Sequence, residues 1–156
     1  MRRCTMEDLK KVISINLVTL PEHYSDYFFE DILKSSPESF IVAENDGVIV
    51  GYIMCRIEYG FSNFKRFSLI RKGHIVSLAV LEEHRKNGLG KSLISSAVEA
   101  LKFKGCNEVY LEVRATNEEA VKIYKQLGFK ITSILKGYYR DNEKANLMVF
   151  QLTENN

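Results

Sequence analysis

The chain has 156 residues, 46% hydrophobic and 27% charged, which is the balance of an ordinary globular protein of one domain. Its formal net charge of +2, from 22 Lys and Arg against 20 Asp and Glu, is too small to indicate a nucleic-acid-binding protein. Three cysteines without CxxC spacing exclude a cysteine-only zinc site of the usual form and argue against a disulfide framework. No signal-peptide pattern or membrane-spanning apolar run occurs, so we expect a cytoplasmic protein.

The first third of the chain predicts two helices and a hairpin. Residues 6–20 carry apolar side chains at helical spacing, namely Leu9, Val12, Ile13 and Leu17. Residues 24–33 form a second, aromatic-rich helical segment. Apolar runs at 40–43 and 48–53 flank the turn sequence at 45–47, which is typical of strand, turn and strand.

The middle of the chain leads from a buried strand into a loop and a helix. Residues 60–71 show no period and are interpreted as a loop, whereas 73–81 is a β-rich run without polar alternation, as in a strand buried on both faces. A polar, glycine-punctuated loop follows at 82–91. The next helix carries an apolar stripe formed by Leu89, Leu93, Ala97, Ala100 and Leu101.

The last third alternates strands with one helix. Residues 108–113 predict a strand, and Thr116 and Glu119 have the capping-box spacing that opens a helix over 116–127. Gly128 ends that helix. Two further strands complete the sheet, at 129–135 and 145–152.

This order of elements describes a mixed α/β fold with a parallel crossover at its centre. No linker, repeat or charge block divides the chain. We therefore expect a single domain over residues 1–152, followed by a polar tail at 153–156.

The loop after the buried strand has the chemistry of an anion site. Arg85, Gly88 and Gly90 stand in the spacing Arg-x-x-Gly-x-Gly, directly before an amphipathic helix. Glycines let backbone amides approach a ligand closely, and a helix N-terminus presents unpaired N–H groups, so a diphosphate fits there. The spacing matches neither the P-loop nor the dinucleotide-binding pattern. The alternative is a glycine-rich turn that binds nothing.

Three segments resemble a known family, the GNAT acetyltransferases. Residues 80–94 look like its motif A, whose loop holds the pyrophosphate of acetyl-CoA, in the pattern Val80-x4-Arg85-Lys86-Asn87-Gly88-Leu89-Gly90-Lys91-Ser92-Leu93-Ile94. Residues 117–129 are similar to its motif B, in the pattern Asn117-Glu118-x-Ala120-x3-Tyr124-x2-Leu127-Gly128-Phe129. The opening, Arg3-x-Thr5-x-x-Asp8-Leu9, is also typical of that family.

The resemblance implies the GNAT fold, a mixed, mostly antiparallel sheet of about seven strands with a parallel central pair and about four helices. It also implies acetyl-CoA as cosubstrate, with the backbone of the buried strand pairing with its pantetheine arm like an added strand. The residues expected to bind acetyl-CoA are Leu78, Ala79, Val80, Arg85, Lys86, Asn87, Gly88, Leu89, Gly90, Lys91, Ser92, Asn117 and Tyr124.

Within the family, the chain is more similar to the archaeal and eukaryotic protein N-terminal acetyltransferases. The segments that carry this similarity are 20–24, 58–63, 71–80, 110–114 and 136–139. The similarity implies acetyl transfer to protein or peptide N-termini, with Glu22 favouring small first residues such as Ser or Ala. The peptide-side residues that it implies are Glu22, Tyr24, Tyr138 and Tyr139. Two alternatives remain, a lysine or small-amine acetyltransferase of the same fold and a CoA-binding module without activity.

His74 and Glu112 are the candidate base. An α-amine with a pKa near 8 is about one-tenth neutral at pH 7, so a modest base, or one acting through a water, suffices. The two residues lie in strands on either side of the crossover helix, so we expect these strands to be parallel neighbours. The resemblance implies that both deprotonate the amine. The alternative is a structural histidine, with Glu112 paired to Arg114 or a lysine.

Tyr124 lies seven residues after Asn117, on the same helix face, so both could meet one extended ligand. The resemblance implies that the Tyr124 phenol protonates the leaving thiolate and that Asn117 bonds the pantetheine arm. The alternative for Tyr124 is an ordinary half-buried aromatic of the helix. Cys55 and Cys106 belong to no nucleophile arrangement with a histidine, so direct attack by the amine is expected.

A basic run flanks this region, formed by Lys65, Arg66, Arg71 and Lys72. Such a run is a solvated face or, alternatively, a contact with an acidic substrate or a ribosome surface. We expect no nucleic-acid or membrane partner. We also expect no metal, because a His/Glu pair falls short of the ligands of a structural zinc site.

Overall fold

The computed structural model describes residues 1–65 and 67–152. Its helices are α1 (Leu9–Thr19), α2 (Asp26–Ser35), α3 (Leu89–Phe103) and α4 (Glu118–Gln126). Its strands are β1 (Arg2–Arg3), β2 (Phe40–Asn45), β3 (Val48–Phe61), β4 (Leu69–Val80), β5 (Glu108–Arg114), β6 (Lys130–Leu135) and β7 (Ala145–Gln151). Single 3-10 turns occur at Met6–Asp8, Pro37–Ser39 and Glu82–His84.

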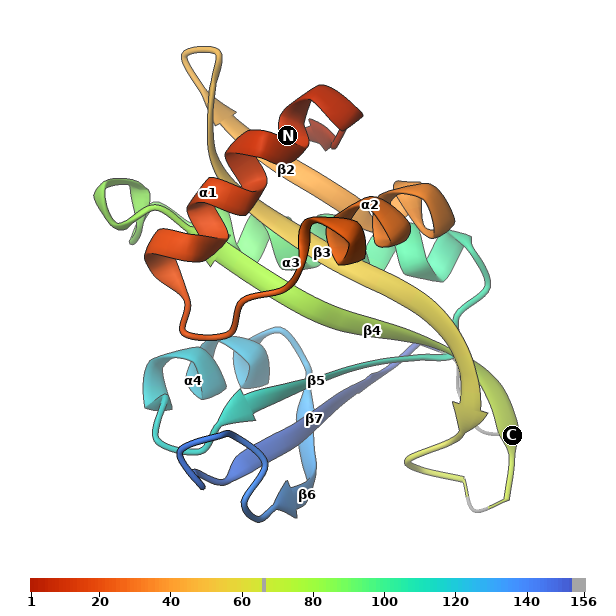
Figure 1. Ribbon diagram of the computed structural model, residues 1–156. Helices are drawn as coiled ribbons and strands as arrows, with labels where there is room; N and C mark the ends of the chain where they lie inside the picture. The colour runs from red at the N-terminus through yellow and green to blue at the C-terminus, as the bar shows by residue number, and fades with distance from the viewer. Residues whose placement is uncertain (66, 153–156) are drawn as a thin grey trace. The chain divides into compact units, whose positions relative to one another are not determined.

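The strands form one sheet in the order β1-β2-β3-β4-β5-β7-β6 (Figure 1). The β4–β5 pair is parallel, while β1–β2, β2–β3, β5–β7 and β6–β7 are antiparallel. The described residues therefore confirm the expected mixed sheet of seven strands with a parallel central pair and four helices.

Contacts along the chain group into two compact units. The first comprises residues 1–56 and 75–103, and the second comprises residues 57–74 with the described residues from 104 onward. Strands β3 and β4 each pass from one unit into the other, so neither unit is a continuous piece of chain. The predicted tail at 153–156 lies outside the described residues.

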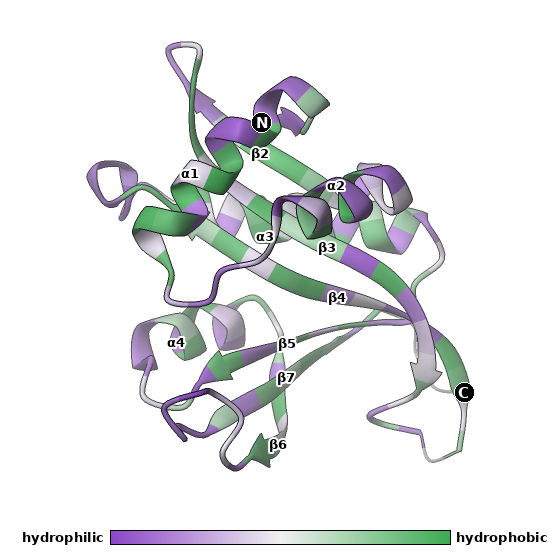
Figure 2. Cartoon of the chain, in the orientation of Figure 1, coloured by the Kyte–Doolittle hydropathy of each residue, from purple (hydrophilic) through white to green (hydrophobic). Residues whose placement is uncertain are grey.

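In the first unit, α1 and α2 lie on one face of β2 and β3, and α3 lies on the other face (Figure 1). Strand β2 begins with four buried residues and β3 has seven in succession, which Figure 2 shows as hydrophobic stretches between the helices. Close packing requires a glycine at Gly51, where a Cβ atom would stand 3.0 Å from the carbonyl oxygen of Ala79.

The buried stripe of α1 differs from the predicted one. Leu17 is 57% exposed, whereas Ile15 and Asn16 are buried beside Leu9 and Val12. The reason is that Asn16 has polar partners inside the unit, so a polar residue occupies an inward position that an apolar pattern cannot reveal.

The loop predicted at 60–71 is too long, because both of its ends belong to strands and only its middle lies outside them. Strand β3 continues through Phe61 and β4 begins at Leu69, and the N–H of Ser62 donates to the carbonyl of Ser68 at 2.8 Å. Tyr59, Phe61 and Leu69 are largely exposed, so these strand ends lack the inward-facing apolar residues on which a strand prediction depends.

In the second unit, β5 pairs with β7 and β7 with β6, and α4 connects β5 to β6. The predicted capping box is wrong. Asn117 is the N-cap, since its Oδ1 accepts from the N–H of Ala120 at 3.2 Å, whereas the Thr116 hydroxyl donates to Glu143. Gly128 ends the helix as predicted, with φ +105°.

Among the residues described, no helix is both long and apolar enough to cross a membrane.

Candidate active site

His74 and Glu112 lie in direct contact. The parallel ladder pairs His74 with Tyr110, which places Glu112 two residues further along β5, on the same face as Tyr110. His74 Nε2 is 2.7 Å from Glu112 Oε2, and the two side chains are only 11% and 16% exposed. The expected parallel neighbours are thus confirmed. Arg114, the alternative partner of Glu112, instead forms ion pairs with Asp141 and Glu143.

The chemistry of this pair follows from its geometry. An ionised carboxylate can only accept hydrogen bonds, so Nε2 of His74 donates to Glu112 and carries the ring proton. Nδ1 is then the ring nitrogen without a proton while the imidazole is neutral. A carboxylate hydrogen-bonded to Nε2–H stabilises an imidazolium, so a pair with this geometry can serve as a proton acceptor.

Tyr110 stacks on this pair, and two further side chains contact Tyr110. The Tyr110 ring stacks on the His74 imidazole, with centroids 4.4 Å apart and planes 3° from parallel, and its hydroxyl donates to Glu58 Oε1. Lys72 Nζ lies 4.6 Å from the centroid of the same ring. The sequence indicates no role for Tyr110 or Glu58, because Tyr110 meets His74 only through the strand register and Glu58 is reached only through Tyr110.

The β6–β7 loop holds the two predicted tyrosines. Arg114 Nη1 lies 2.7 Å from Asp141 Oδ2 and 2.5 Å from Glu143 Oε2, and its guanidinium lies 4.1 Å from the Tyr139 ring centroid. The hydrogen bond from Arg114 lowers the pKa of Asp141. Tyr138 packs edge-on against Tyr139 and is 48% exposed. Arg114 therefore anchors this loop to the end of β5.

Tyr124 and Asn117 lie two turns apart on α4. Tyr124 is 7% exposed, and its ring packs edge-on against Phe129 with centroids 5.4 Å apart. Asn117 is exposed, and its Oδ1 is taken up by the helix cap. Its Nδ2 group, which the cap does not use, is the donor that a ligand would meet.

In the first unit, Glu22 is anchored through its backbone. The buried Asn16 Nδ2 donates to the carbonyl of Glu22 at 3.2 Å and to the Tyr52 hydroxyl at 3.1 Å. Tyr52 and Ser77 hydroxyls lie 2.7 Å apart, and burial raises the pKa of Tyr52. Asn16 is a positioning residue that the sequence did not reveal.

Tyr24 is held to β4. Its hydroxyl donates to the carbonyl of Val76 at 3.3 Å, and its ring stacks on Phe28 with centroids 4.8 Å apart. Glu22 and Tyr24 therefore lie on a loop that is fixed at both residues.

The predicted anion loop, residues 85–92, leads into α3. Arg85 Nε donates to the carbonyl of Val80 at 2.8 Å, which fastens the loop to the end of β4. Lys86 and Gly88 both have left-handed backbones, with φ +67° and +78°, and the N–H of Ser92 donates to Gly88 to begin the helix. A Cβ atom at Gly88 or Gly90 would meet no atom within 4 Å, so a ligand has room to reach the loop backbone.

The predicted site residues thus fall in both units. The second unit contains His74, Glu112, Asn117, Tyr124, Tyr138 and Tyr139. The first unit contains Glu22, Tyr24, the strand residues Leu78, Ala79 and Val80, and loop 85–92. His74 and Glu112 are brought into contact.

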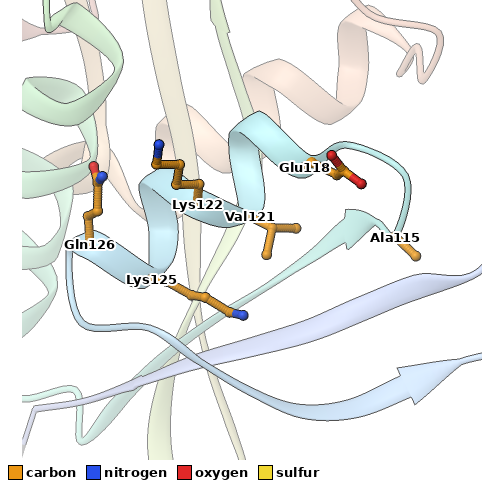
Figure 3. A pocket seen from close by; sticks show the side chains of 6 residues that line it. All are labelled: Ala115, Glu118, Val121, Lys122, Lys125 and Gln126. Atoms are coloured by element: carbon orange, nitrogen blue, oxygen red, sulfur yellow. The ribbon is translucent and has the colours of Figure 1, made fainter.

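A hollow lies along α4 (Figure 3). It is lined by Ala115, Glu118, Val121, Lys122, Lys125 and Gln126. None of the predicted site residues lines it, so we assign it no part in the site. Within the described residues, no three His, Cys, Asp or Glu side chains gather as a metal site would require.

Known proteins similar to this chain include acetyltransferases. Residues 9–129 match the model of the Acetyltransferase (GNAT) family. An N-alpha-acetyltransferase from Sulfurisphaera tokodaii is 48% identical, over 97% of this chain and 92% of its own. The crystal structure of Ard1 from Thermoplasma volcanium has a TM-score of 0.83 at 31% identity, covering 98% of this chain and 97% of its own.

Naa50 from Arabidopsis thaliana, solved in complex with the bisubstrate analogue CoA-Ac-MVNAL, has a TM-score of 0.80 at 27% identity, covering 94% of each chain. The family model covers most of the chain, and the Sulfurisphaera relative is matched over nearly its whole length. The chain therefore belongs to the GNAT acetyltransferase family, among its N-alpha-acetyltransferases.

Proposed function

We propose that the protein transfers the acetyl group of acetyl-CoA to the α-amine of protein N-termini. The observation that carries this proposal is the half-enclosed His74–Glu112 pair, with 2.7 Å between Nε2 and Oε2. A protein that only binds CoA needs no such proton acceptor. The names of its N-alpha-acetyltransferase relatives support an α-amine as the acceptor.

The pair acts as the base, directly or through one water. The amine attacks in its neutral form, and as its nitrogen bonds to the thioester carbon, Nδ1 of His74 takes the proton that this nitrogen must lose, while Glu112 stabilises the imidazolium through Nε2–H. The carbon–sulfur bond then breaks, and the imidazolium returns its proton to solvent. The Tyr124 phenol gives its proton to the departing thiolate, and the resulting phenolate is reprotonated by solvent. Ordinary pKa values near 10 and 8.5 put phenol and thiol within reach of each other.

Attack is direct, without an acetyl-enzyme intermediate. Cys4, Cys55 and Cys106 are all buried and none is in a disulfide. Burial raises the pKa of the Cys4 thiol to about 12 and also raises that of Cys106, which removes their thiolate forms at neutral pH. Trapped acetyl-cysteine that chases into product would contradict direct attack.

Acetyl-CoA binds chiefly through backbone groups. Its diphosphate meets the N–H groups of loop 85–92 and the N-terminus of α3, where the terminal nitrogens of Arg85 add charge. Its pantetheine arm pairs with the β4 backbone at Leu78, Ala79 and Val80 and with Asn117 Nδ2. The open space above Gly88 and Gly90 supports this fit.

The peptide end is bound by the two anchored loops. Hydroxyl groups of Tyr138 and Tyr139 bond the backbone of the first residues. The Tyr24 hydroxyl, which donates to Val76, accepts from a backbone N–H there. Glu22 lies near the amine or the first side chain and favours Ser or Ala there.

The test is acetylation of two short peptides, one starting Ser-Ala and one starting Met-Leu, each with an internal lysine. Fragmentation mass spectrometry locates the label. We expect acetyl on the α-amine, with the Ser-Ala peptide faster. Label on lysine alone would make the protein a lysine acetyltransferase, and CoA binding without product would make it a binding module. A faster Met-Leu peptide would overturn only the role of Glu22.

Residues 1–152 form one cooperative domain under this proposal, because β3 and β4 are shared by both compact units. Thermal unfolding should then show the same transition by circular dichroism and by tyrosine fluorescence. Three cysteines without disulfides support a cytoplasmic location. Contact with a ribosome through Lys65 and its basic neighbours would appear as salt-sensitive cosedimentation; Arg66 lies outside the described residues.

A further inference from the structure

We propose that Tyr110, held by Glu58, is a positioning residue that sets the plane of the His74 imidazole for proton transfer. The inference rests on the proposed function, because it assigns a partner to the base of that reaction. Tyr110 touches His74 rather than the amine, so its effect on catalysis passes through the histidine.

The strand register explains why these rings meet. Tyr110 is the residue of β5 directly paired with His74 of β4, so their side chains leave the sheet side by side on one face. The rings are 3° from parallel with centroids 4.4 Å apart. A ring lying flat on the imidazole blocks rotation about its Cβ–Cγ bond, and rotation is what would take Nε2 away from Glu112.

Tyr110 is itself fixed at its far end. Its hydroxyl donates to Glu58 Oε1 on β3, and Lys72 Nζ lies 4.6 Å from its ring centroid. A phenol that donates to a carboxylate gains electron density in its ring. That ring attracts a cation on its face more strongly, so it also favours the imidazolium that forms when His74 takes up a proton.

Three strands thus supply one chain of contacts, Glu58 to Tyr110 to His74 to Glu112. The stacking supplies the orientation and the Glu58 bond prevents the phenol ring from turning. We therefore expect loss of the ring to matter far more than loss of its hydroxyl.

The first experiment compares Tyr110→Leu with Tyr110→Phe in the peptide assay. Tyr110→Leu should lower kcat about 100-fold and leave the KM for acetyl-CoA within about twofold, since misorientation of a catalytic group affects the chemical step. Tyr110→Phe keeps the stacked ring and should recover kcat to within about fivefold of the wild type. Phe150→Leu is the matched control, a half-buried aromatic on β7 that touches neither His74 nor Glu112 in the described contacts. It should lower the melting temperature without a comparable fall in kcat.

The decisive experiment is a double-mutant cycle with His74→Ala. If Tyr110 acts through His74, Tyr110→Leu should change kcat less than about twofold in the His74→Ala background. A further fall of about 100-fold there would mean general damage and would overturn the proposal. Equal kcat for Tyr110→Leu and the wild type, or no rescue by Tyr110→Phe, would also overturn it.

These outcomes are distinct from failure of the proposed function. If the wild type acetylates lysine instead of α-amines, the α-amine assignment fails, and the same cycle run on the lysine peptide still tests Tyr110. If His74→Ala alone keeps the wild-type kcat, His74 is not the base and Tyr110 has nothing to act through.

Discussion

Two carboxylates in this protein are each paired with a basic side chain, one in each compact unit. In the first unit, Asp8 receives both arms of the Arg2 guanidinium at 2.6 and 2.9 Å and also accepts from the Thr5 N–H at 2.7 Å. In the second unit, Glu112 receives one imidazole nitrogen of His74 at 2.7 Å. The difference lies in the partner, because arginine always carries its charge whereas histidine gains and loses one near neutral pH.

That difference is the basis for expecting a structural role for the Arg2–Asp8 pair and the proposed chemical role for the His74–Glu112 pair. Hydrogen bonds from Arg2 lower the pKa of Asp8 to about 2, so at neutral pH neither partner exchanges a proton and the pair only ties the N-terminus to the start of α1. In the proposed function the His74–Glu112 pair accepts the amine proton and keeps its hydrogen bond. A paired carboxylate is therefore a candidate for catalysis when its partner can accept a proton, as an imidazole can and a guanidinium cannot.

The largest expected effect is on kcat, and it should appear when Glu112 is neutralised but not when Asp8 is. Glu112→Gln should lower kcat about 100- to 1,000-fold, the size of a general-base contribution, because the amide no longer stabilises a charged imidazolium. Asp8→Asn should leave kcat within about twofold, as no proton moves through that pair. Steady-state kinetics on the Ser-Ala peptide measures both.

The same two variants should rank in the opposite order when the free energy of unfolding is measured instead of kcat. Asp8→Asn should lower the free energy of unfolding, whereas Glu112→Gln should keep it within about 0.5 kcal/mol. A Glu112→Gln protein that loses stability and activity in parallel would contradict the division between the pairs.

Two glycines with a left-handed backbone also differ in their expected function. Gly88 and Gly47 have nearly the same left-handed φ, +78° and +77°, and a Cβ atom at either position would meet nothing within 4 Å. Alanine at either one should therefore lower stability alike, by about 1 kcal/mol. Only Gly88→Ala should raise the KM for acetyl-CoA, about tenfold, since Gly88 belongs to the anion loop and Gly47 to the β2–β3 turn. Equal KM values for acetyl-CoA in the two variants would contradict binding of its diphosphate by this loop.

Arg114 offers an intermediate case, a permanent cation that holds the loop proposed to bind the peptide. Arg114→Gln removes its ion pairs with Asp141 and Glu143 and so loosens the loop that carries Tyr138 and Tyr139. The KM for the peptide should rise about fivefold while the KM for acetyl-CoA stays unchanged. Arg140→Gln, the same charge change at an exposed position of that loop, is the control. A KM change in both variants would point to net charge instead of anchoring.

The features that could be predicted from the sequence are those that produce a recognisable residue pattern or order of elements. Glycines before an amphipathic helix indicated loop 85–92, Gly128 indicated the end of α4, and the order of elements indicated that the strands of His74 and Glu112 are neighbours. Each of these depends on local chemistry or on topology, which composition and spacing express directly.

The features that could not be predicted depend on register or on competing polar partners. Tyr110 meets His74 only because those two positions are paired across strands, and the sequence does not state the register. Asn16 occupies a buried helical position because Tyr52 and the Glu22 carbonyl accept its hydrogen bonds. Asn117 caps α4 in place of Thr116 because the Thr116 hydroxyl is bonded to Glu143.

The smallest effect expected is the pH dependence of the structural pair. The pKa of Asp8 is about 2 in the folded chain and near 3.8 when unfolded, so its ionised form favours folding above pH 4 and this contribution disappears as the pH falls from about 4 to about 2. Because the Arg2 side chain is 41% exposed, solvent screens the pair and its contribution at neutral pH should be about 1 kcal/mol.

Urea unfolding of the wild type and Asp8→Asn at pH 7, 4 and 3 measures this contribution. The difference in free energy of unfolding should be about 1 kcal/mol at pH 7 and should shrink at pH 3, because protonation then removes the charge from the wild type as well. Glu7→Gln, an exposed carboxylate one residue earlier, should show a difference below about 0.5 kcal/mol at every pH. A difference for Asp8→Asn that stayed constant down to pH 3 would mean that its effect comes from the hydrogen bonds with Thr5, which the asparagine side chain alters at any pH. The ion pair with Arg2 would then contribute nothing to stability.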